Sequence, residues 1–166
     1  MAIELKSLDQ LKSMRKAGLL VGETLQLLRE TIKPGMTTSA LDAVAAANIK
    51  RGGGTSNFLG YHGYPATICT SVNSQVVHGI PGELVLHEGD VISIDCGAIV
   101  DGWHGDTSRM FHVGETSIQA KRLCKLTYEA MWLGIQQVKP GAKLGDIGFV
   151  IQDFAEKNGI SVVREF

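Results

Sequence analysis

Two aspartates interrupt the apolar stretch VISIDCGAIVDGWHGDTSRMF, residues 91–111. The pair Asp101-Gly102 at its centre predicts a two-residue hairpin turn, because both central positions of a type I′ turn need a positive φ. Pairing across that turn places Asp95 opposite Ser108. Side chains alternate between the two faces of a strand, so Asp95 and Asp106 become diagonal neighbours on one face. Their carboxylates can therefore converge on one point.

Two converging carboxylates repel each other and lose solvation when they are buried, so something must compensate their charge. The same alternation puts Arg109 on the opposite face and His104 on the shared face. A protonated aspartate, a pairing with His104 and a pair of solvent-facing aspartates near the turn are all compatible with the pattern. A divalent cation satisfies both carboxylates at once without a basic partner, and the residues favour that interpretation.

The overall composition bounds the class of protein. The chain has 166 residues, 44% hydrophobic and 20% charged, with a net charge of −1, which is typical of an ordinary globular domain. No Lys/Arg stripe indicates a nucleic-acid surface, and no apolar run suggests a membrane span. The N-terminus lacks an apolar signal core, so a cytoplasmic location is expected. Three widely spaced cysteines, Cys69, Cys96 and Cys124, argue against a disulfide framework or a structural zinc site.

The elements that must position the aspartates follow from periodicity and stop signals. A capping box and apolar residues at helical spacing predict a helix over residues 7–32, which Lys33-Pro34-Gly35 ends. A second helix is predicted over 38–50, with Gly52-Gly53-Gly54 at its end. The β-branched and alternating pattern of residues 55–115 then predicts strands.

A similar order of elements follows a second time. Helices are predicted over 118–138 and 145–157, Lys139-Pro140-Gly141 lies between them, and ISVVREF at residues 160–166 is expected to begin a strand. Lys139 lies 106 residues after Lys33, and the element order matches, which favours a structural repeat even though the short tripeptide could recur by chance. The second copy has seven residues after Gly159, so its half of the sheet is expected to be missing from this chain.

An ordered set of motifs resembles the type I methionine aminopeptidases, and the resemblance extends over essentially the whole chain. It implies an α+β pita-bread fold, in which two pseudo-symmetric α-β halves enclose a site on a curved antiparallel sheet. The chain would then be a fragment of a single catalytic domain, with a first half at about 1–115 and an incomplete second half at about 116–166. The motifs that carry the resemblance are LGYHGYP, VVHGIP, ISIDCGAIVDGWHGDTSRMF and SVVREF.

The resemblance also implies roles for single residues in a dinuclear metallopeptidase. Asp95 matches the aspartate that chelates one metal, and Asp106 matches the aspartate that bridges both. His78 matches a histidine near the scissile bond that contacts substrate and helps stabilise the transition state. Four residues match positions that line or flank the methionine pocket: Tyr61, His62, Tyr64 and Cys69. Outside this motif set, the same residues would be read as a strand end, half-buried aromatics and a core thiol.

The implied enzyme removes the N-terminal methionine from new polypeptides with two divalent cations, which could be cobalt, manganese, iron or zinc. Its expected partners are peptides with an N-terminal methionine and nascent chains at the ribosome, and a monomer is expected. The family completes its site with a histidine and two glutamates beyond Phe166, so we expect little activity and weak metal binding from these residues alone. The alternatives are a non-catalytic or partner-dependent pita-bread module and a prolidase-like peptidase.

Overall fold

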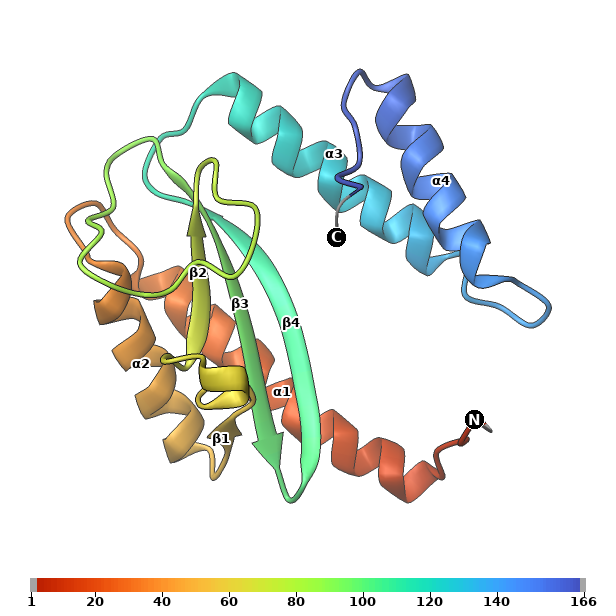
Figure 1. The fold of residues 1–166 in the computed structure, drawn as a ribbon, viewed down its shortest axis with the longest axis horizontal. Helices are drawn as coiled ribbons and strands as arrows, with labels where there is room; N and C mark the ends of the chain where they lie inside the picture. The colour runs from red at the N-terminus through yellow and green to blue at the C-terminus, as the bar shows by residue number, and fades with distance from the viewer. Residues whose placement is uncertain (1–2, 165–166) are drawn as a thin grey trace. The chain divides into compact units, whose positions relative to one another are not determined.

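The computed structural model describes residues 3–164. The chain divides into two compact units, Met1–Thr116 and Ser117–Phe166. In the first unit, two helices accompany an antiparallel sheet of four strands (Figure 1). Its elements are α1 (Leu8–Thr31), α2 (Thr38–Arg51), β1 (Thr55–Ser56), the 3₁₀ turn η1 (Tyr61–Gly63), β2 (Ile68–Val72), β3 (Val91–Val100) and β4 (Trp103–His112).

Strand β3 is the centre of the sheet. It pairs along its whole length with β4, and its first part also pairs with β2 while its end pairs with the short β1. Helix α1 contacts both β3 and β4 and crosses behind them in Figure 1. One face of the central strand therefore packs on the helices, and the other face is available for a functional site.

The hairpin that carries the two aspartates forms as its sequence predicts. Asp101 and Gly102 both have a positive φ, +50° and +80°, as a type I′ turn requires. The resulting register pairs Asp95 with Ser108 and Gly97 with Asp106. The prediction that both aspartates share one face is confirmed by this register.

Helix α1 begins where the sequence predicts. The side chain of its N-cap Ser7 accepts a hydrogen bond from the backbone N–H of Gln10 (3.3 Å), and the Gln10 side chain accepts one from the backbone N–H of Ser7 (2.7 Å). The predicted apolar stripe is buried only in its second part. Leu8 is 77% exposed, whereas Leu28 is fully buried.

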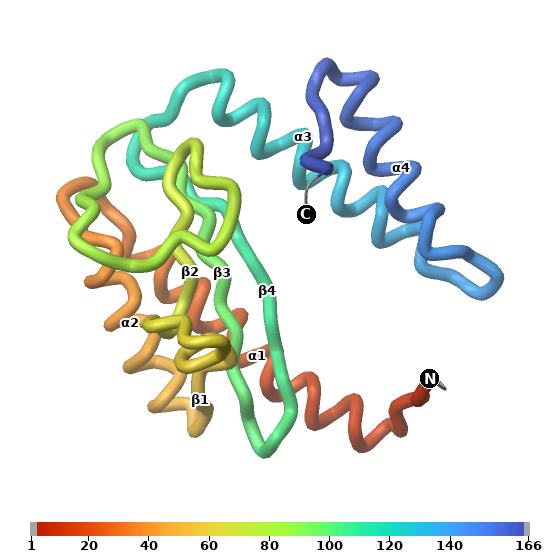
Figure 2. Tube along the Cα trace, in the orientation of Figure 1, coloured from red at the N-terminus to blue at the C-terminus, as the bar shows by residue number. Residues whose placement is uncertain are grey.

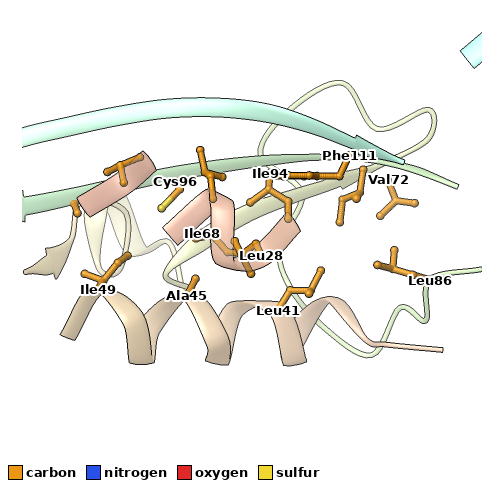
Figure 3. Packing of buried hydrophobic residues seen from close by; sticks show 14 of the residues in the cluster. Leu28, Leu41, Ala45, Ile49, Ile68, Val72, Leu86, Ile94, Cys96 and Phe111 are labelled. Carbon is orange, nitrogen blue, oxygen red and sulfur yellow. The ribbon is translucent and has the colours of Figure 1, made fainter. Parts of the chain in front are cut away.

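The core of the first unit lies between the helices and the sheet. Figure 3 shows side chains of the sheet facing side chains of α1 and α2. Alternate residues of β3 supply one side of this core, as expected for a strand with one face packed on helices. The labelled core residues with almost no exposure are Leu28, Leu41, Ala45, Ile49, Ile68, Leu86, Ile94 and Cys96.

The region predicted as strands, residues 55–115, contains less strand than expected. Residues 73–90 between β2 and β3 form turns and loops (Figure 2). Part of this segment is bound to the turn after α1, because the N–H groups of Gly35 and Leu86 donate to the carbonyls of Leu86 and Met36, both at 2.8 Å. The loop thus obtains its hydrogen bonds from a turn that is distant in sequence.

The second unit contains α3 (Ile118–Ile135) and α4 (Leu144–Lys157). The prediction of a final strand is wrong over residues 160–164, which are irregular, and residues 165–166 lie outside the described part. A strand needs a neighbour to receive its backbone hydrogen bonds, and the described residues of this unit form none. Among the helices that the structure describes, none is long and apolar enough to cross a membrane.

Candidate metal centre

Asp95 and Asp106 lie on the face of the sheet opposite the helical core. The flanking residues of β3, Ile94 and Cys96, point to the core and are fully buried, so Asp95 points the other way. Asp95 is half-buried, and Asp106 on β4 is more exposed. The helices therefore cover the back of this hairpin, and the carboxylates project from its front.

Both carboxyl groups hold their protons more tightly than ordinary aspartates. Partial burial raises the pKa of Asp95, and the nearby His78 opposes that rise. Partial burial also raises the pKa of Asp106, and the negative charge of Asp95 and a hydrogen bond with Asp95 raise it further. The Oδ1 atom of Asp95 is buried and has no hydrogen-bond partner in the described part of the protein. The charge of His104 opposes the rise in the pKa of Asp106, so histidines offset the burial of this acid pair only in part.

His78 reaches the same region from the loop after β2. Its φ is +59°, an unusual value for a residue with a side chain, and its neighbour Gly79 is pressed onto β2. The N–H of Thr70 donates to the Gly79 carbonyl (2.7 Å), and the Gly79 N–H donates to the Ser71 hydroxyl (3.1 Å). A Cβ atom at residue 79 would lie 2.1 Å from the Thr70 carbonyl oxygen. Close backbone packing at Gly79 thus fixes the backbone from which His78 acts on the charge of Asp95.

Cys69 and Tyr64 complete this cluster of side chains. Cys69 pairs directly with Asp95 across β2 and β3, so both side chains lie on the same face. The Tyr64 hydroxyl lies within hydrogen-bond distance of the carbonyls of Ile68 (3.0 Å) and Gly79 (3.1 Å). Burial and a hydrogen bond with Cys69 raise the pKa of Tyr64, and burial raises the pKa of the Cys69 thiol. Both groups are neutral near pH 7 and provide a polar but uncharged wall.

Tyr61 and His62 are not brought to the carboxylates in the same way. They belong to η1, and their rings pack edge to face with centroids 4.3 Å apart. Tyr61 is 67% exposed. The turn that carries them leads directly to Tyr64, and their place beside a substrate stays a prediction.

Comparison with known proteins identifies the family to which the chain belongs. The sequence profile described as metallopeptidase family M24 matches residues 12–166. The chain belongs to metallopeptidase family M24. Members of this family use divalent metal, so the predicted metal chemistry is confirmed at that level, while the number and identity of the ions are not given by the match.

Curated relatives show which members of family M24 this chain resembles. It is 46% identical to a methionine aminopeptidase of Clostridium perfringens over 164 residues, which cover 99% of this chain and 66% of the relative. It is also 46% identical to a methionine aminopeptidase of Rickettsia prowazekii over 166 residues, which cover 100% of this chain and 64% of the relative. The chain thus spans about two thirds of the length of these relatives. The predicted resemblance to methionine aminopeptidases is confirmed.

Solved structures agree on the fold. The crystal structure of the Rickettsia prowazekii methionine aminopeptidase superposes with a TM-score of 0.97 at 45% identity, covering 99% of this chain and 66% of that one. A Xaa-Pro dipeptidase from Bacillus anthracis superposes at 0.83 with 22% identity, covering 93% of this chain and 42% of that one, and shows the fold alone. The predicted α+β pita-bread fold with an incomplete second half is confirmed.

The carboxylates of this M24 chain fit a divalent cation. Two aspartates supply hard oxygen donors, and the unpaired buried oxygen of Asp95 is an acceptor that a cation would satisfy. No ion pair with lysine or arginine compensates either aspartate within residues 3–164. In the same residues, no three side chains of His, Cys, Asp or Glu gather as a complete metal-binding group. The aspartates are thus candidates for part of a ligand set.

One polar residue at this site was missed in the sequence. Asn57 follows β1, and its side chain lies against Gly97, two residues after Asp95 in β3. Its Oδ1 atom is buried without a hydrogen-bond partner in the described residues. A glycine inside a central strand often marks the close approach of another group. Gly97 was therefore the signal that could have revealed Asn57.

Proposed function

We propose that the protein acts in the removal of N-terminal methionine from nascent polypeptides by metal-assisted peptide hydrolysis. The observation that carries the proposal is the converging pair Asp95–Asp106, with one carboxylate oxygen buried and unpaired. Its support is the family M24 match together with relatives named methionine aminopeptidase. The proposed substrates are peptides that begin with methionine, which the protein encounters as nascent chains emerge from the ribosome in the cytoplasm. The protein is proposed to act as a monomer.

The two aspartates are the proposed ligands of two divalent cations, cobalt, manganese, iron or zinc. Asp95 would hold one cation, and Asp106, on the same face of the hairpin, would supply the second carboxylate to the metal site. Bound cations of this kind lower the pKa of water and polarise a scissile carbonyl. Because burial already disfavours two negative charges, binding of a cation relieves the repulsion between these carboxylates.

The other side chains position the substrate in this proposal. His78 acts on the charge of Asp95 and extends from a backbone that Gly79 fixes, and we propose that its imidazole hydrogen-bonds to the peptide at the scissile bond. Tyr64 and Cys69 form an uncharged wall beside the carboxylates that suits an apolar thioether side chain. Tyr61 and His62, in the turn η1 that precedes Tyr64, are the proposed contacts at the outer side of the methionine side chain.

The decisive experiment compares two aspartates of the same hairpin. In the full-length protein with manganese or cobalt, Asp106→Asn is expected to reduce turnover of a Met-Ala-Ser peptide by at least about a thousandfold, because the neutral amide cannot share its charge between cations. The matched control is Asp101→Asn in the turn, where an Asn-Gly pair suits the positive φ of +50°. Circular dichroism of both variants checks the fold.

Retained turnover in Asp106→Asn with an intact fold would refute the proposed role of the aspartate pair. These 166 residues by themselves are expected to bind manganese weakly, because the described part contains no third ligand beside the pair. Calorimetry with manganese on the 166-residue chain measures this directly, and tight binding at two sites would contradict it. A preference for Xaa-Pro dipeptides over Met-Ala-Ser would assign the prolidase-like activity instead.

A further inference from the structure

The missing side chain at Gly97 leaves a space on the face that carries both aspartates. Gly97 lies directly opposite Asp106 and two residues after Asp95, so these three positions share one face. A Cβ atom at residue 97 would lie 2.8 Å from the Nδ2 and 3.0 Å from the Cβ of Asn57. The Asn57 side chain therefore fills the place beside the carboxylates that a residue at 97 would occupy.

Asn57 is hydrogen-bonded to both strands that carry the aspartates. Its backbone N–H donates to the carbonyl of Gly97 on β3 (3.2 Å), and its Nδ2 donates to the carbonyl of Gly105 on β4 (3.3 Å). Gly105 immediately precedes Asp106. One residue thus joins the backbone near Asp95 to the backbone next to Asp106.

The strand beside Asp106 is held from its other face as well. A Cβ atom at Gly105 would lie 2.5 Å from the carbonyl carbon of Ala17 in α1, which shows how closely the helix backbone packs on the strand there. Gly105 is consequently held between α1 on one face and the Asn57 amide on the other. Removing the amide would free only the side of the strand that faces the site.

The remaining atom of the amide is an unused acceptor. The contact of Nδ2 with the Gly105 carbonyl fixes the orientation of the amide, because a carbonyl can accept only from its NH₂ side. The Oδ1 atom of Asn57 is therefore directed away from Gly105, and it is buried without a partner in the described residues, as is Oδ1 of Asp95. Two unpaired buried oxygens at neighbouring positions indicate that a donor or a cation belongs there.

We propose that Asn57 is a positioning residue for the Asp95–Asp106 pair. Its amide holds β3 and β4 at the separation that the cations require, and its Oδ1 accepts a hydrogen bond from a water molecule that enters with a cation. This inference rests on the proposed function, because it assumes that the pair binds divalent cations. It adds a residue outside the motifs that carried the family resemblance.

The first test measures Mn²⁺ affinity by calorimetry on the full-length protein. Asn57→Leu retains the approximate volume of the side chain but loses both polar atoms, and we expect it to weaken Mn²⁺ binding about 10–100-fold, as is typical when a residue supporting metal ligands is lost. The control is Asn48→Leu, which removes another asparagine of the same unit, one that donates to the Thr24 hydroxyl (2.9 Å) away from the site. That variant is expected to lower the thermal midpoint while leaving Mn²⁺ affinity unchanged.

The second test uses the shared space of Asn57 and Gly97. Gly97→Ala is expected to displace the amide and weaken Mn²⁺ binding to a similar degree, because the new methyl group would collide with Asn57. Adding Asn57→Ala to Gly97→Ala removes the contacts with the amide and leaves only the contact between the two Cβ atoms at 3.0 Å. The double variant is therefore expected to bind Mn²⁺ about as well as Asn57→Ala alone and to regain part of the thermal stability lost in Gly97→Ala. Non-additive effects of this kind are the signature of residues in contact.

The outcomes separate this inference from the function on which it rests. If Asp106→Asn abolishes Mn²⁺ binding while Asn57→Leu binds like the unmodified protein, the role of Asn57 is refuted and the aspartate pair stands. If Asp106→Asn also leaves Mn²⁺ binding unchanged, the cation site itself is refuted and the inference falls with it. Additive losses in the Asn57 and Gly97 variants would likewise overturn the proposed contact.

Discussion

In each unit a Lys-Pro-Gly turn links two helices, but the helices are buried differently in the two units. Gly35 and Gly141, the last residues of the two Lys-Pro-Gly turns, have φ values of +88° and +86°. The helices that follow, α2 and α4, are each 14 residues long. Leu41 of α2 is fully buried, whereas its counterpart 106 residues later, Ile147 of α4, is only half-buried.

The difference between the units lies in the sheet. In the first unit, β3 and its neighbours offer an apolar face on which α1 and α2 pack. The described residues of the second unit contain α3 and α4 without a strand, and large apolar side chains such as Leu144 (86% exposed) and Phe149 (73% exposed) remain uncovered. Local sequence is thus sufficient to place turns and helix ends, while burial depends on distant partners.

The largest expected contrast between the units concerns core truncation. Leu41→Ala is expected to lower the free energy of unfolding of the first unit by about 2–5 kcal/mol, because it leaves a cavity in a closed core. Ile147→Ala in the second unit is expected to cost about 1 kcal/mol, because its side chain is already partly in water. Urea unfolding followed by circular dichroism, with hydrogen exchange resolved by peptide, measures both units.

Equal costs at Leu41 and Ile147 would show that the two cores are equally closed, against the burial seen in the structure. The hydrogen-exchange readout is needed because two units can unfold separately, in which case one global transition would not report on each.

The parts of the site that could be predicted from the sequence depend on local signals. Asp101-Gly102 fixes its own turn type, the turn fixes the register, and the register places Asp95 and Asp106 on one face. Each step involves neighbours along the hairpin. The prediction therefore required no knowledge of the rest of the fold.

The parts that could not be predicted depend on contacts between distant segments. The backbone at His78 is held by the packing of Gly79 on Thr70, and the residues around VVHGIP do not predict that contact. Asn57 reaches the site only because β1 pairs with the end of β3. The expected strand in ISVVREF was wrong over residues 160–164 because strand formation requires a partner, which a single segment cannot reveal.

Substitution of the two matched glycines, Gly35 and Gly141, is expected to have an intermediate effect on the stability of each unit. Gly35→Ala and Gly141→Ala should each destabilise their own unit by about 1–2 kcal/mol, because alanine is strained at a positive φ. No atom lies within 4 Å of a Cβ atom at either position, so the backbone alone determines the cost. The same hydrogen-exchange experiment measures both variants, and similar losses would show that the turns are independent of the sheet.

The control for this pair is Gly18→Ala within α1. A Cβ atom there also meets nothing within 4 Å, but the backbone is helical, so alanine is expected to stabilise the helix by up to about 1 kcal/mol. A loss at Gly35 that exceeded the loss at Gly141 by several kcal/mol would mean that the first turn depends on its contact with the loop at Leu86.

The smallest expected effect concerns the N-caps of the matched helices. The Thr37 side chain accepts a hydrogen bond from the Ala40 N–H (3.2 Å) at the start of α2. At the corresponding place before α4, the Lys143 side chain has no acceptor, and its backbone N–H donates to Asp146 (2.8 Å). Lys143→Thr is therefore expected to stabilise α4 by about 0.5–1 kcal/mol, and Thr37→Ala to destabilise α2 by about 1 kcal/mol.

Hydrogen exchange of the backbone amides in the first turns of α2 and α4 measures the effects of these two substitutions. A gain of protection confined to α4 in Lys143→Thr would show that a local hydrogen bond is sufficient to strengthen a helix that lacks a sheet to pack on. If the new threonine instead left α4 unprotected, helix stability in the second unit would be limited by missing tertiary contacts, since a cap can stabilise only a helix that is already populated.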